Sequence, residues 1–114
     1  MQTTTLLKDK WQSTLDQISK AISNNTVSIV VNGETIGSQT EVEDVTFYGI
    51  SYDPKDDLIA IETADLEHNI EAPQEIDLAH EGAKLVSIEI VGEDEVRHLL
   101  NFTPALDYPA LGSR

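Results

Sequence analysis

Residues 41–63, EVEDVTFYGISYDPKDDLIAIET, contain two runs with strand character on either side of a short polar segment. In the first run, apolar side chains such as Val45 and Phe47 alternate along an extended chain. The segment between the runs, DPKDD at residues 53–57, has the chemistry of a tight turn. Aspartate bonds backbone amides two residues on, and proline presets the next φ. The stretch therefore predicts an antiparallel hairpin, whose aspartates form either a turn or a carboxylate site.

Residues 8–23 are predicted to form one amphipathic helix. Asn24 and Asn25 suit its end, because asparagine tolerates the left-handed backbone conformation. We expect Trp11 to anchor this helix on a sheet. The apolar side chains recur at spacings of three and four residues and so form one stripe: Leu7, Trp11, Leu15, Ile18 and Ile22.

The predicted fold class is α+β, with this N-terminal amphipathic helix packed on an antiparallel meander sheet of five or six strands. Alternating apolar runs at residues 27–31 and 86–90 supply further strands, and Asn32-Gly33 marks a turn. One domain is expected over residues 1–103. Residues 104–114, PALDYPALGSR, repeat Pro-Ala-Leu and are expected to form an extended tail, because proline cannot donate a ladder hydrogen bond.

The protein is strongly acidic. Its 114 residues have a net charge of −14, and residues 34–114 carry all of the negative excess. Such a field repels phosphate backbones, so we expect no direct nucleic-acid binding. The absence of cysteine excludes disulfides, thiolate zinc sites and cysteine catalysis. No stretch has the apolar length of a signal peptide or a membrane span, so we expect a cytoplasmic protein that does not enter a membrane.

The candidate binding residues surround the turn and include one histidine: Tyr52, Asp53, Lys55, Asp56, Asp57 and His68. Hard cations need several oxygen ligands, which the three aspartates offer in part. The pattern lacks the alternating ligands and closing glutamate of a twelve-residue calcium loop, so only a weak divalent-cation site is indicated. Turn chemistry alone also accounts for each residue type. No cofactor is predicted, and no metal is assigned.

Four functional hypotheses follow. The preferred one is a non-catalytic acidic protein-binding or adaptor module, including one that self-associates into a homo-oligomer through an edge strand. The alternatives are a weak divalent-cation-binding domain at the 53–57 turn, a small enzyme of unknown reaction using Tyr52, Asp53 and His68, and a DNA-mimicking inhibitor. An enzyme is less favoured than a binding module, because the chain has neither a glycine-rich phosphate loop nor a nucleophile elbow. No catalytic residue is assigned.

Four segments occur in an order typical of a known family: IGSQ, GISYDPKDDLIAIE, LEHNIEAPQEI and LVSIEIV. The chain resembles a family of small bacterial proteins known only as a domain of unknown function, with a GISYDPKDD core motif and a later HxIxxPxEI stretch. The resemblance covers roughly residues 11–104 and departs at NGETIG and at the tail. It implies a shared fold and a bacterial source but no activity. It directs attention to Gly49, Tyr52, Asp53, Pro54, Lys55, Asp56, Asp57, His68, Pro73 and Glu75.

Overall fold

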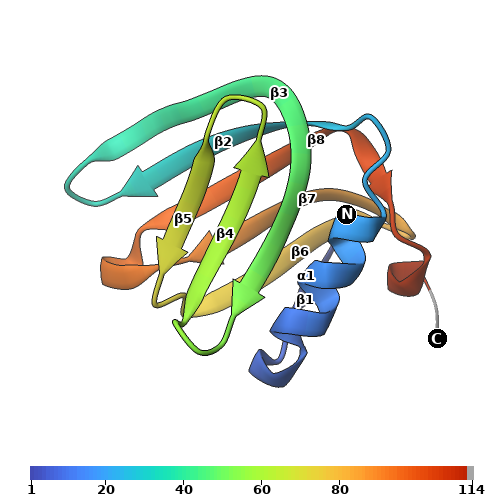
Figure 1. The fold of residues 1–114 in the computed structure, drawn as a ribbon, viewed down its shortest axis with the longest axis horizontal. Coiled ribbons are helices and arrows are strands. Elements are labelled where there is room, and N and C mark those ends of the chain that lie inside the picture. The colour runs from blue at the N-terminus through green and yellow to red at the C-terminus, as the bar shows by residue number, and fades with distance from the viewer. Residues whose placement is uncertain (113–114) are drawn as a thin grey trace.

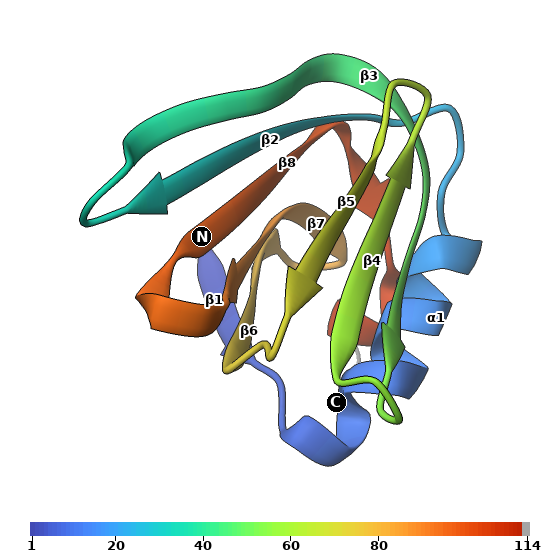
Figure 2. The same ribbon diagram turned by 60° about the vertical axis from the view of Figure 1, so that its left-hand side comes forward.

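The protein is built from one strongly curved antiparallel sheet and one α-helix in the computed structural model, which describes residues 1–112. The sheet order is β1-β6-β7-β8-β2-β3-β4-β5. The sheet curls over so that β4 and β5 lie across β6, β7 and β8 (Figures 1 and 2). The strands are β1 (Gln2–Thr5), β2 (Thr26–Gly33), β3 (Gly37–Asp53), β4 (Leu58–Thr63), β5 (Glu67–Glu71), β6 (Glu75–Glu81), β7 (Lys84–Val91) and β8 (Arg97–Asp107). The helices are η1 (Lys8–Lys10), α1 (Trp11–Lys20), η2 (Glu93–Glu95) and η3 (Pro109–Gly112).

Strand β3 joins the two layers of the curved sheet. Its residues 37–46 pair with β2, whereas its residues 47–53 pair with β4 on the opposite edge. The pairing with β2 contains register shifts typical of bulges, and Asp44 in the same region has a φ of 51°. The backbone N–H of Asp44 donates to Ser28 Oγ at 3.0 Å, which satisfies a donor that the bulge would otherwise leave unpaired.

Helix α1 lies along the edge of β3 that β2 leaves (Figure 2). The Ser19 hydroxyl accepts a hydrogen bond from the Ile50 backbone N–H at 2.8 Å and donates one to the Ile50 carbonyl at 2.6 Å. The helix thus supplies, through one side chain, the two bonds that a neighbouring strand would have made at this position. Its buried face, formed by Trp11, Leu15 and Ile18, closes the open side of the core.

The core between the layers consists mainly of aliphatic side chains from alternating strand positions. In β2, Val27, Ile29 and Val31 are buried, as the alternation predicts. From the facing layer, Ile59 and Ile61 belong to the same cluster and are fully buried. Burial of each such side chain contributes about 1.5–3 kcal/mol to folding, so the cluster favours the curled sheet over a flat one.

The predicted fold class is wrong in its balance of elements. The described chain is mostly sheet, with eight strands and one ten-residue α-helix, instead of five or six strands carrying a packed N-terminal helix over residues 8–23. The strand β1, QTTT, contains no apolar residue and therefore shows no apolar alternation, and all four of its residues are exposed. The strand β5 has one buried residue, Ile70. The sheet is also no simple meander, because β2 pairs with β8 and β1 with β6. Leu7 is 71 % exposed and lies outside the helix.

The expected tail begins inside β8, which continues past residue 103 to Asp107. Its last residues pair with the start of β7, where Leu106 lies opposite Leu85. The peptide bond before Pro104 is cis. The register of the pairing between β7 and β8 shifts between Leu85 and Ser87. Leu106 and Tyr108 are buried, and the Tyr108 hydroxyl donates to Gln17 Oε1 of α1 at 2.5 Å. Residues 104–112 therefore pack on the domain, and residues 113–114 of the predicted tail lie outside the described part.

Within residues 1–112, no helix is long and apolar enough to cross a membrane.

We predict that Ser19→Ala destabilises the protein by about 1–3 kcal/mol, because it leaves the Ile50 N–H and carbonyl without their partner in a partly buried place. Chemical denaturation of the purified protein measures this change. The matched control is Ser13→Ala on the same helix, where the hydroxyl is exposed and bonds only the Lys10 carbonyl at 3.4 Å. The control is expected to stay within about 0.5 kcal/mol of the wild type. Equal stabilities for the two variants would contradict the role assigned to Ser19.

Candidate functional site

The 53–57 segment is a built turn at the end of the β3–β4 hairpin. Asp53 Oδ1 accepts a hydrogen bond from the Lys55 backbone N–H at 2.9 Å, which is the bond that an aspartate makes at the first position of a turn. Asp57 has a φ of 50°, and its carbonyl accepts from the Ala72 backbone N–H at 3.0 Å. The turn is therefore tied to the segment that follows β5.

Tyr52 connects this turn to helix α1. Its hydroxyl donates to Asp57 Oδ1 at 2.7 Å, and its ring meets the Trp11 ring edge-on, with centroids 5.2 Å apart. The hydrogen bond to Asp57, then burial and the negative charges of Asp57 and Asp53, raise the pKa of Tyr52 to about 12. The ammonium of Lys8 lies 5.5 Å from the Trp11 ring centroid, within reach of a cation–π contact. Tyr52 is thus a buried structural anchor with a neutral hydroxyl.

The arrangement of the turn does not support the hypothesis of a divalent-cation site. One carboxylate oxygen of Asp53 and one of Asp57 already accept hydrogen bonds within the hairpin. Lys55 and Asp56 are exposed. Among the side chains that the structure describes, which leave out that of Asp94, no group of three or more histidines, aspartates or glutamates is arranged to hold a metal ion. The assignment of the turn residues as binding residues stays a prediction.

His68 lies away from the turn and pairs instead with His98. His68 Nε2 and His98 Nδ1 are 2.9 Å apart, and the ring centroids are 5.0 Å apart. Burial lowers the pKa of His68, against an opposing effect of Glu41. Burial and the neighbouring His68 lower the pKa of His98 to about 4. At neutral pH both rings are therefore uncharged, and one donates its N–H to the other. The structure therefore does not bring the three residues of the enzyme hypothesis together, because Tyr52 is hydrogen-bonded to Asp57 whereas His68 is hydrogen-bonded to His98.

The histidine pair lies beside an open depression that we call the edge cleft. One part, of about 350 Å³, lies between β5 and the start of β8 and is lined by Asn69, Ile70, Glu71, Glu93, Val96 and His98. A second part, also of about 350 Å³, lies under the tip of the β2–β3 hairpin and is lined by Gly33, Glu34, Thr35, Ile36 and Val96. Val96 lines both parts.

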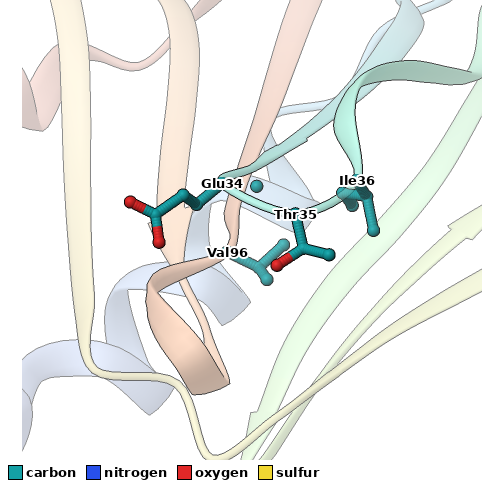
Figure 3. Close-up of a pocket in the computed structure, with 5 residues that line it drawn as sticks. Glu34, Thr35, Ile36 and Val96 are labelled. Atoms are coloured by element: carbon teal, nitrogen blue, oxygen red, sulfur yellow. The ribbon is translucent and has the colours of Figure 1, made fainter.

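The lining of the edge cleft combines apolar side chains with carboxylates. Figure 3 shows the Thr35 side chain turning toward Val96, whereas the Glu34 carboxylate extends away from it. Ile70 is buried, and Glu71 and Glu93 are exposed. Ile36 adds a large apolar side chain that is 46 % exposed.

Of the candidate binding residues predicted from the sequence, only His68 contacts a residue of this cleft, through its hydrogen bond with His98, and none of them lines it. His98 is not among the candidate residues predicted from the sequence, and its partner His68 lies 30 residues away on a strand that is not its neighbour in the sheet. Val96 and Ile36 follow turn-like segments and gave no functional signal. The one available hint was the inward position of His98 in the alternation of β8, where Leu100 and Phe102 are buried.

The curved eight-stranded sheet with its edge-filling helix and acidic cleft defines a small, β-rich protein. The chain belongs to a family of unknown function (DUF5335), whose model matches residues 2–111. It is 36% identical over 110 residues to an uncharacterized protein of the bacterium Aquifex aeolicus (strain VF5), a match that covers 96% of this chain and 99% of the relative. No solved structure matches the chain. The resemblance to a bacterial family of unknown function is therefore confirmed.

We predict that Tyr52→Phe lowers the free energy of unfolding by about 1–3 kcal/mol at neutral pH, because it removes a hydrogen bond to a carboxylate. Folding raises the Tyr52 pKa from 10.0 to about 12, so this stabilisation is complete below the lower value and is lost as the pH rises through the higher one. Denaturation curves of both proteins, recorded from neutral into alkaline solution, should converge. Tyr48→Phe, at a side chain that is 62 % exposed, is the control and should change little. A constant gap between wild type and Tyr52→Phe would contradict the assignment.

We also predict that acid weakens the fold through the histidine pair. The His98 pKa falls on folding from 6.5 to about 4, so its stabilising effect is complete above the higher value and is lost as the pH drops through the lower one. Melting curves of the wild type and His98→Gln should therefore approach one another on acidification between these values. Parallel pH profiles for the two proteins would show that the pair does not titrate in this way.

Proposed function

We propose that this protein is a non-catalytic binding module that takes an extended, positively charged protein segment along the free edge of β5 and into the edge cleft. The observation that carries this proposal is the position of the cleft at the end of the sheet. β5 is the last strand in the sheet order, so within the described residues its outer edge has no strand neighbour. Such an edge is a template for a further strand.

The charge of the edge supports a basic partner. The outward positions of β5 include Glu67 and Glu71, and Glu93 lies across the cleft. A segment that pairs with β5 would place alternate side chains on this acidic side and the others toward Ile70 and Val96. The net charge of −14 adds long-range attraction for a basic partner and opposes self-association through the same edge.

The turn motif supports a structural role for the residues that an enzyme or cation site would need. The Tyr52 hydroxyl and the Asp53 and Asp57 carboxylates all make hydrogen bonds inside the hairpin. Among the described contacts, the carboxylates of Glu71 and Glu93 make no such hydrogen bonds. They can therefore bind a partner without breaking the hydrogen bonds of the hairpin.

The proposal is tested with two synthetic peptides that alternate valine with either lysine or glutamate. We expect the lysine peptide to shift backbone amide resonances of β5 and of residues 93–98, with an affinity that falls as salt is added. Glu93→Lys should weaken this binding. Asp16→Lys, which makes the same charge change on an exposed position of α1, should leave it close to the wild type.

Two results would contradict this function. One is equal binding of the glutamate peptide. The other is a set of shifted resonances on the outer strand β1 with none on β5, because β1 is the opposite edge of the sheet.

A further inference from the structure

His68 and His98 interrupt two otherwise apolar rows that face the interior. In one layer, the row runs from Ile50 through Ile61 to His68, as the pairings of β3, β4 and β5 show. In the other layer, His98 of β8 lies between Ile90 of β7 on one side and Val31 of β2 on the other. Polar side chains at inward positions are costly unless they are bonded, and here each histidine has the other as its bonded partner. An aliphatic pair would fill these positions at less cost, so the imidazoles call for a chemical explanation.

We propose that His68 and His98 form a two-imidazole binding site for a transition-metal ion of the Zn²⁺, Ni²⁺ or Cu²⁺ type. Imidazole nitrogen is a preferred ligand of these ions. Two nitrogens that bind one tetrahedral zinc ion at its usual distance lie roughly 3.3 Å apart. His68 Nε2 and His98 Nδ1 are 2.9 Å apart, so the rings would separate slightly and rotate until both lone pairs point at the ion. This site goes beyond the proposed peptide-binding role and does not depend on it.

The protonation state of the pair suits metal binding. Burial lowers the pKa of both rings, which favours the uncharged imidazoles that can bind a metal ion. The hydrogen bond between the rings uses one N–H. When the ion replaces that bond, this proton moves to the other nitrogen of the same ring. His68 and His98 are both only partly buried, so solvent reaches part of the pair.

The remaining coordination positions open into the edge cleft. His98 lines the part of about 350 Å³ together with Glu71 and Glu93, which leaves room for water ligands beside two carboxylates. Among the side chains that the structure describes, which leave out that of Asp94, no third histidine, aspartate or glutamate completes a metal-binding group. The proposed site therefore consists of the two imidazoles, with water in the remaining positions. Such an open site is typical of exchangeable metal and differs from the closed four-ligand structural sites.

His80 provides an internal comparison. Its ring is 3 % exposed, and both of its nitrogens are engaged, Nε2 with Thr4 Oγ1 at 2.9 Å and Nδ1 with the Gly82 carbonyl at 2.9 Å. This histidine ties β1 to β6 and offers no free nitrogen to an ion. A metal that binds the pair should therefore affect two of the three histidines of the chain.

The experiment titrates zinc chloride into the chelator-stripped protein, with magnesium chloride at equal ionic strength as the control. We expect one zinc ion per chain by calorimetry and changes in the imidazole resonances of His68 and His98, with those of His80 unchanged. His68→Gln and His98→Gln should each weaken zinc binding about tenfold or more. Asp56→Asn, which removes an exposed carboxylate of the turn, should leave it unchanged.

The wild-type resonances decide the matter even where a histidine variant fails to fold. Unshifted imidazole resonances of His68 and His98 at saturating zinc would overturn the proposal. So would an equal response to magnesium, or loss of zinc binding in Asp56→Asn, because either result would assign the ion to carboxylates.

Discussion

The bend of β3 is the constraint on which the rest of the structure depends. One strand of 17 residues pairs with β2 through its first part and with β4 through its last part, and so belongs to both layers of the sheet. The bulges and the positive φ of Asp44 turn the strand between these pairings. Once β3 turns, β4 and β5 must lie over β7 and β8. The turn also exposes one backbone edge of β3, and Ser19 of α1 satisfies that edge at Ile50.

Asn25 holds the other side of the same bend. Its side chain is buried, accepts from the Ser23 backbone N–H at 2.7 Å and donates to the Pro104 carbonyl at 2.7 Å. Its own carbonyl accepts from the Phe47 backbone N–H at 3.1 Å, where β3 changes partner. A residue that suits the end of a helix thus also ties together the end of α1, the bend of β3 and the last part of β8. Fully bonded polar groups of this kind specify one arrangement of strands, because any other arrangement leaves them unpaired.

The sequence predicts the local parts of this structure better than their arrangement. Alternation identified the buried face of β2, and turn chemistry identified the role of Asp53, because both depend on neighbouring residues. The strands β1 and β5 were missed because an edge strand that buries one residue or none lacks the alternation that marks a strand. The partner of His68 could not be predicted from the sequence, for another reason. The His68–His98 contact depends on the curl of the whole sheet, and no local pattern encodes that curl.

The two edges of the sheet differ in a way that favours a role for the β5 edge. β1 is short and neutral, with threonines along most of its length, and it is fixed to β6 by the bond between Thr4 and His80. β5 carries carboxylates at its outward positions. Charges on an edge strand prevent pairing with other copies of the same chain, since like charges repel. The same charges would attract the basic segment that we propose as the partner. Under the proposed function, the carboxylates of β5 would therefore both select a basic segment and oppose pairing with another copy of the chain, whereas the neutral edge β1 offers no such discrimination.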